Sequence, residues 1–180
     1  MKEALRIVRT ALILLLISGI TVLLIASVNM LTKAPIEERR LAELRESMSG
    51  LFPDADFTEL NTEDGSVIYE MTKGNNTVGY CVVTESMGFG GSIKLLCGFD
   101  TELSVVGVKV TEHAETKSKF DPVNSKEHLS QYEGKTAPFA FGEGVDAVSG
   151  STVSSKAILK GINDAGDILE SYLSEKGEGK

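Results

Sequence analysis

The chain has 180 residues, of which 18 are basic and 26 acidic, so its formal net charge is −8 at pH 7. This length suits one membrane segment and one modest domain, and the acidic balance argues against a nucleic-acid surface. Only 6% of the residues are aromatic and tryptophan is absent, so the sequence offers no platform on which bases could stack.

An apolar stretch near the N-terminus predicts a membrane anchor. Residues 1–10 carry three cations and one acid, and residues 11–28 are uncharged, with the uncharged run continuing to Thr32. This run reaches the length needed to cross a bilayer, which is about 18–20 residues. A cleaved signal peptide is the alternative, but its apolar region is usually about 7–15 residues, and residues 26–28 form a poor cleavage site. We therefore expect an uncleaved helix at 11–31.

The cations before the apolar run predict the orientation of that helix. By the positive-inside rule the N-terminus stays in the cytoplasm, and everything after Lys33 lies outside the cell (inner) membrane. We expect a single-pass protein whose only contact with membrane lipid is this one helix.

A further helical pattern follows the anchor. Pro35 fits a first helical position, acidic residues follow it, and Gly50 is a plausible stop. The expected apolar stripe consists of Leu41, Leu44, Met48 and Leu51. We interpret 32–55 as a stalk that continues the membrane helix and docks on the domain, and an ordinary amphipathic first helix is the alternative.

The pattern changes to that of strands between Asp56 and Val110. Two pairs of strand-like segments, 66–71 with 77–84 and 92–97 with 103–110, each flank a short turn. Two consecutive hairpins predict a mainly antiparallel sheet with one covered face, flanked by helices from both ends of the sequence. The expected fold class is α+β.

Further expectations concern the interior and one short helix. In the last predicted strand Val106, Val108 and Val110 should share one face, and Phe139 and Phe141 should belong to the core. A short helix is possible around 125–132. The two cysteines, Cys81 and Cys97, could pair outside the cytoplasm, but we favour two buried thiols. An iron–sulfur cluster needs about four thiolates and is excluded.

The stretch from Asp146 to Ser155 places hydroxyls and a glycine before a helical pattern. The apolar stripe of that helix consists of Ile158, Ile162, Ala165, Leu169 and Tyr172. Ser154 or Ser155 could serve as N-cap, which would put Thr152 just before the positive end of a helix dipole. Such a place suits a phosphate group, although ordinary loop and cap chemistry explains the same residues.

Two other segments have both a functional and a purely structural interpretation. The glycines of residues 88–91, G-F-G-G, let the backbone approach a ligand or simply make a bend. His113 and Glu115 would share a face at a strand end. Two candidate ligands are weak evidence for zinc, so we predict no metal site there and favour a solvated strand end.

Together these segments resemble the FMN-binding domain family. Residues 146–152, D-A-V-S-G-S-T, are similar to the flavinylation signature D-x-x-S-G-A-T of that family. The G-F-G-G segment and the H-x-E-T of residues 113–116 match two further motifs in the same order. The chain departs from the pattern at Ser151, where Ala is usual, and after Thr116, where P-G-L-G usually follows.

The resemblance implies that a flavin transferase esterifies the phosphate of FMN to Thr152, which would make the chain a phosphoprotein with covalent flavin. No residue is expected to act as a catalytic acid or base. The other residues that the resemblance assigns to the cofactor are Asp146, Ser149, Gly150, Ser151, Gly90, Gly91, Glu115 and Thr116.

With a single membrane helix and this motif order, the whole resembles the family of G subunits of Rnf-type electron-transport complexes. The implied role is a non-autonomous redox subunit that passes electrons between other membrane and iron–sulfur or flavin subunits, while ferredoxin and NAD chemistry drives Na⁺ or H⁺ transport. A free-standing extracytoplasmic flavin reductase or redox sensor and a cofactor-free interaction module are the alternatives. The expected parts are a cytoplasmic N-terminus at 1–10, the membrane helix at 11–31, the stalk at 32–55, the FMN-binding domain at 56–174 and a flexible tail at 175–180.

Overall fold

The structure, a computed structural model, describes residues 2–62 and 65–177. They fall into two compact units, residues 1–43 and residues 44–180, which we describe separately. Helix α1 (Lys2–Leu51) contributes to both units. It runs through Pro35, so the expectation that a helix begins at Pro35 is wrong.

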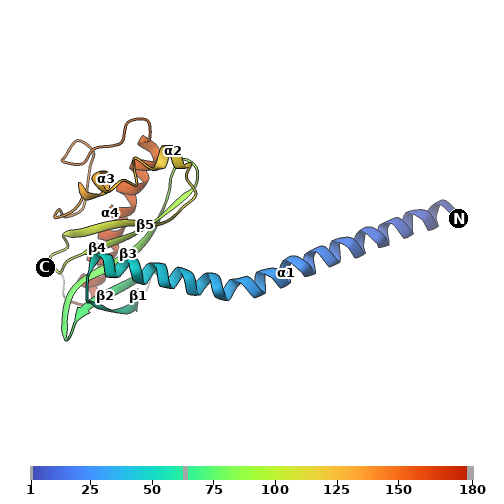
Figure 1. Cartoon of the computed structure of the whole chain (residues 1–180), viewed down its shortest axis with the longest axis horizontal. Coiled ribbons are helices and arrows are strands. Elements are labelled where there is room, and N and C mark those ends of the chain that lie inside the picture. The colour runs from blue at the N-terminus through green and yellow to red at the C-terminus, as the bar shows by residue number, and fades with distance from the viewer. Residues whose placement is uncertain (1, 63–64, 178–180) are drawn as a thin grey trace. The chain divides into compact units, whose positions relative to one another are not determined.

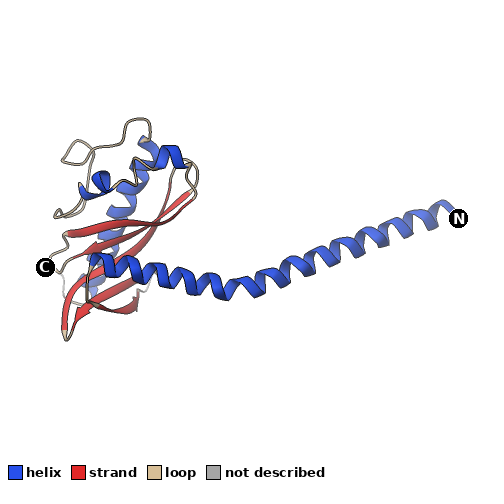
Figure 2. Ribbon diagram, in the orientation of Figure 1, coloured by secondary structure: helices blue, strands red, loops and turns tan. Residues whose placement is uncertain are grey.

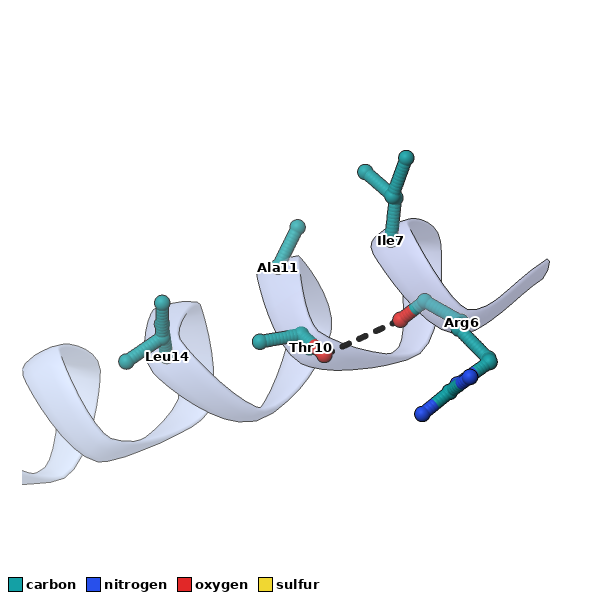
Figure 3. Close-up of a pocket in the computed structure, with 5 residues that line it drawn as sticks. All are labelled: Arg6, Ile7, Thr10, Ala11 and Leu14. Atoms are coloured by element: carbon teal, nitrogen blue, oxygen red, sulfur yellow. Dashed lines mark hydrogen bonds between the residues drawn. The ribbon is translucent and has the colours of Figure 1, made fainter. Parts of the chain in front are cut away.

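The first unit contains the expected apolar helix. Residues Arg6–Thr32 are exposed and form a helix long and apolar enough to cross a membrane. Hydroxyls along it donate to main-chain carbonyls three or four residues earlier, as Figure 3 shows for Thr10 and the Arg6 carbonyl, 3.0 Å apart. The groove in that view is lined by side chains of α1 alone, so it is a furrow along one helix that lipid would fill.

The second unit is built on one antiparallel sheet whose strands follow each other in the order β1-β2-β3-β4-β5 (Figures 1 and 2). Both expected hairpins are confirmed, β2 with β3 and β4 with β5, and β1 adds an edge strand. The strands are β1 (Asp56–Asn61), β2 (Val67–Lys73), β3 (Asn76–Met87), β4 (Ser92–Phe99) and β5 (Val105–His113).

Three helices follow the sheet: α2 (Lys117–Phe120), α3 (Lys126–Ser130) and α4 (Thr152–Glu175). Helix α4 packs across β3 and β4, and every residue of its predicted apolar stripe is buried. Two buried hydroxyls of β3 bind main-chain carbonyls of α4: Thr84 Oγ1 donates to Gly161 O at 2.9 Å and Ser86 Oγ to Ala157 O at 2.7 Å. These bonds fix the helix in register on the sheet.

Both faces of the sheet are covered, so the expectation of one covered face is wrong. On one face α4 closes a large core that includes Phe139, with Phe141 packed at its edge, as predicted. On the other face Met48 and Phe52, at the end of α1 and just beyond it, pack on Tyr69, Met71, Cys81 and Leu96. An amphipathic segment that precedes a sheet can cover the second face, which the strand pattern alone did not reveal.

The last strand contains a bulge, and the prediction that three valines share a face is wrong for one of them. Val108 and Val110 pack in the core beneath α4, whereas Val106 packs on the opposite side. The pairing of β4 with β5 shifts by one residue at Gly98/Phe99, and such an extra residue turns the side chains that precede it to the other face.

The cysteines are free and fully buried, which confirms the preferred interpretation. Cys81 lies opposite Gly98 and Cys97 opposite Val82 on the paired strands β3 and β4, and the thiols belong to different cores. Neighbouring register positions point to opposite faces, so the two sulfurs cannot pair. Burial raises the pKa of both thiols, that of Cys81 to about 12.

Candidate functional site

The signature stretch leads directly into α4, and the helix begins earlier than expected. Thr152 is its first residue and Ser151 its N-cap, whereas Ser154 and Ser155 are buried in the first turn. Ser155 Oγ accepts from Val148 N at 3.0 Å and donates to Ser151 O at 3.1 Å, so it closes the preceding loop and does not cap the helix. Thr152 therefore lies in the turn whose N–H groups lack carbonyl partners within the helix.

Two neighbouring hydroxyls differ in what they contact. Ser151 Oγ donates to Lys119 O at 2.6 Å, which ties the start of α4 to α2 and leaves Ser151 without a side-chain cap bond. The Thr152 side chain is exposed, and no hydrogen bond to its hydroxyl is found within residues 2–62 and 65–177. Gly150, just before this pair, has a φ of 79°, a left-handed conformation that glycine adopts without strain.

A cavity of about 420 Å³ lies over the start of α4. Residues of both the glycine-rich segment and the signature line the cavity. The lining residues are Phe89, Lys119, Gly150, Ser151, Thr152, Val153 and Ser154. Gly150, Ser151 and Thr152 were predicted site residues, whereas the other four lining residues were not. The contribution of Phe89 and Lys119 depends on how β3, α2 and α4 meet.

The glycine-rich segment makes a tight turn between β3 and β4, in which Gly88 N donates to Gly91 O at 2.8 Å. A Cβ atom on Gly88 would overlap Glu115 Oε1, and one on Gly91 would lie 2.6 Å from Ala114 Cβ. On Gly90 a Cβ would lie 3.1 Å from Ala114 O. The glycines thus let this turn pack closely on the segment after β5.

Glu115 binds the main chain of the glycine-rich turn. It is buried, and its Oε1 accepts from Phe89 N at 2.5 Å. Its Oε2 is buried without a hydrogen-bond partner in the described part of the chain. Glu115 therefore fixes Phe89, which lines the cavity, without lining the cavity itself.

The other predicted residues do not line the cavity. Thr116 is exposed and is the N-cap of α2, Ser149 is exposed in the signature loop, and Asp146 begins that loop with its main chain bound to Gln131.

His113 packs its ring on Phe120, with centroids 4.3 Å apart. No cluster of three or more potential metal ligands occurs within the described ranges.

The lining residues fit a phosphate-bearing ligand with an apolar body. The exposed Thr152 hydroxyl stands at the start of a helix, where N–H groups and the dipole favour an anion, and Lys119 adds a cation. The exposed side chains of Phe89 and Val153 offer apolar surface at the same cavity.

Comparison with known proteins supports this interpretation. Residues 88–167 match the FMN-binding domain and residues 1–50 match the RnfG N-terminal region. The chain is 28% identical over 168 residues to the G subunit of the proton-translocating ferredoxin:NAD(+) oxidoreductase complex of Clostridium ljungdahlii, covering 89% of this chain and 88% of the relative. It is 27% identical over 183 residues to the G subunit of the ion-translocating oxidoreductase complex of Methanosarcina acetivorans, covering 94% and 97%.

Among solved structures the chain is similar to Shewanella oneidensis NqrC, with a TM-score of 0.48 and 19% identity over 59% of this chain and 62% of that one. The match to the FMN-binding domain, residues 88–167, includes both the glycine-rich turn and the signature. The match to the RnfG N-terminal region, residues 1–50, includes the apolar helix. The chain therefore matches the RnfG N-terminal region in its first part and an FMN-binding domain in its second, which confirms the resemblance to the G subunits of Rnf complexes that its sequence motifs predicted.

Proposed function

We propose that this chain is the electron-transfer subunit of a membrane-bound, ion-translocating oxidoreductase of the Rnf type and that it carries FMN covalently on Thr152. The observation that carries the proposal is the cavity where the glycine-rich turn meets an exposed hydroxyl at the start of α4. The match to an FMN-binding domain and the similarity to the G subunits of such complexes support it.

The contacts of the two hydroxyls favour Thr152 over Ser151 as the attachment point. The proton of Ser151 Oγ is engaged with the Lys119 carbonyl, whereas the exposed Thr152 hydroxyl can reach a flavin transferase. A phosphoester on Thr152 keeps one negative charge. The free N–H groups of the first helical turn and the Lys119 ammonium would stabilise that charge.

Bound FMN would supply reversible electron transfer, and the chain's own residues would position it. Phe89 would cover part of the cavity, and Glu115 would hold Phe89 in place through its main chain. The residues that line the cavity include no histidine or carboxylate that could serve as an acid–base group. This favours exchange of electrons with protein partners over oxidation of a small organic substrate.

We propose that α1 anchors the chain once in the cell membrane, with the N-terminus in the cytoplasm and the FMN-binding domain on the other side. The cations before the apolar span support this orientation. The partners would be the other membrane and iron–sulfur or flavin subunits, membrane lipid around α1 and, during maturation, a flavin transferase. A reporter fused after Lys180 should be extracytoplasmic, and a cytoplasmic reporter would contradict the orientation.

The attachment is tested by mass spectrometry of the denatured protein after expression with a flavin transferase. The wild type should gain the mass of FMN minus one water, Thr152→Ala should not, and Ser151→Ala should retain the adduct. An adduct on Thr152→Ala would move the site, with Ser151 the first suspect.

The role is tested in membranes, where Thr152→Ala should abolish electron flow through the complex and leave its assembly largely intact. The isolated outer domain with covalent FMN should accept electrons from artificial donors. Rapid turnover of a small metabolite by that domain would favour the free-standing reductase. A purified chain without visible flavin absorption would favour the cofactor-free module.

A further inference from the structure

The side chain of Gln131 binds the main chain of Asp146, the first residue of the signature loop, and we call this pair of bonds the clamp. Neither residue lines the cavity. Gln131, the C-cap residue of α3, makes two hydrogen bonds to the main chain of Asp146. Its Oε1 accepts from Asp146 N at 2.7 Å, and its Nε2 donates to Asp146 O at 3.1 Å. The clamp uses only the main chain, so the Asp146 side chain remains exposed at the loop surface.

These two bonds fix the orientation of the Gln131 amide. A main-chain N–H can only donate and a carbonyl can only accept, so Oε1 must face the first and Nε2 the second. The remaining hydrogen of Nε2 then faces His128 Nδ1, which lies 2.8 Å away. Nδ1 must therefore accept, and the ring proton of His128 resides on Nε2.

His128 connects this clamp to the core. The imidazole is buried, burial lowers its pKa, and its Nε2 has no hydrogen-bond partner in the part of the chain that the structure describes. Its ring meets Tyr132 edge-on at 6.3 Å, and Tyr132 in turn meets Phe139 edge-on at 5.1 Å. The neutral ring is thus held by packing, and it holds the Gln131 amide in one orientation.

The signature loop is consequently tied at three places. Gln131 binds Asp146, Ser155 Oγ binds Val148 N, and Ser151 Oγ binds the Lys119 carbonyl. The bond at Val148 comes from Ser155, just beyond the signature, and the bond at Ser151 is accepted by Lys119 of α2. The two bonds at Asp146 come from Gln131, the C-cap residue of α3, an element that no motif includes.

We infer that Gln131 is a positioning residue for flavin attachment: by clamping the main chain of Asp146 it holds the signature loop in the conformation in which a flavin transferase meets Thr152. This inference rests on the proposed function, because it assumes that Thr152 is the residue modified. Gln131 itself touches neither the cavity nor Thr152, so its effect passes through the loop.

The test uses the full chain with Gln131→Met and Gln131→Glu. Methionine keeps the length of the side chain without its hydrogen bonds, and glutamate keeps the acceptor for Asp146 N but loses the donor. Lys126→Ala, at an exposed position of α3, is the matched control. Three quantities are measured: amide exchange at Asp146 in the FMN-free chain, the protonation of the two His128 ring nitrogens by NMR, and the rate of FMN incorporation by a flavin transferase.

In the wild type and the control the Asp146 amide should be protected and His128 protonated on Nε2 alone. In Gln131→Met the Asp146 amide should exchange faster by about tenfold, as expected from the loss of the two hydrogen bonds between Gln131 and the Asp146 main chain. FMN incorporation should slow by a similar factor, and the melting temperature should stay within a few degrees of the control. Gln131→Glu should also slow incorporation, because its carboxylate would face the Asp146 carbonyl and unprotonated Nδ1.

Failure of the inference differs from failure of the proposed function. A wild-type chain modified at Thr152, together with a Gln131→Met chain modified at the same rate, overturns the inference alone. Unchanged exchange at Asp146 in both variants also overturns it, since the clamp would then not hold the loop. A wild-type chain that takes up no FMN overturns the proposed function and the inference with it.

Discussion

Replacing Glu115 by alanine should release the glycine-rich turn that covers the cavity. The bond from Phe89 N to Glu115 Oε1 is 2.5 Å long, and Glu115 is 8% exposed, so solvent screens it little. A hydrogen bond to a charged group contributes about 1.5–3 kcal/mol, and truncation leaves the Phe89 N–H without this acceptor. At about 1.4 kcal/mol per factor of ten, local opening of the turn should become about 10- to 150-fold more frequent.

Amide hydrogen exchange at Phe89, followed by NMR in the FMN-free chain, measures this opening directly. Glu115→Gln retains an acceptor oxygen and should show a smaller effect. Glu112→Ala is the matched control, because it removes a carboxylate that is 62% exposed and paired with Lys94 on the surface, where such pairs contribute about 0–1 kcal/mol. If Phe89 exchange in Glu115→Ala stayed within about threefold of the control, the assigned role of Glu115 would be wrong.

Two further predictions concern the framework that carries Thr152. The double variant Thr84→Val/Ser86→Ala removes two buried hydrogen bonds to α4 and should lower the free energy of unfolding by about 2 kcal/mol, measured by chemical denaturation of the FMN-free chain. A loss below about 0.5 kcal/mol would show that packing alone seats α4. Because burial raises the pKa of Cys81 to about 12 and that of Cys97 as well, neither thiol should react with iodoacetamide at pH 8 in the folded chain. Both should react in denaturant, and rapid labelling without denaturant would contradict the burial of the thiols.

The parts of the fold that follow local rules could be predicted from the sequence. Turn residues between alternating apolar segments predicted both hairpins. Apolar residues spaced three and four apart predicted the buried stripe of α4. The bulge that turns Val106 to the second face could not be predicted, because it depends on how β5 pairs with β4. Coverage of that second face likewise depends on where Met48 and Phe52 dock.

In the candidate site, too, some features could be predicted from the sequence and others depend on tertiary packing. The motif resemblance led to Thr152, and the structure places it beside the cavity that the glycine-rich turn helps to form. The expected cap was wrong, because the Ser155 hydroxyl binds Val148 and Ser151 in the preceding loop. The proximity of Lys119 to Thr152 depends on the packing of α2, which no local pattern encodes.

The order of the strands also determines when the surroundings of Thr152 can form during synthesis. Each strand pairs with the one made just before it, so the sheet can assemble as the chain emerges, without waiting for distant segments. Helix α4 is the last element, and until it docks one face of the sheet stays uncovered. Thr152 acquires its surroundings only in that final step. A chain truncated within α4 would therefore leave that face uncovered and expose an aggregation-prone surface.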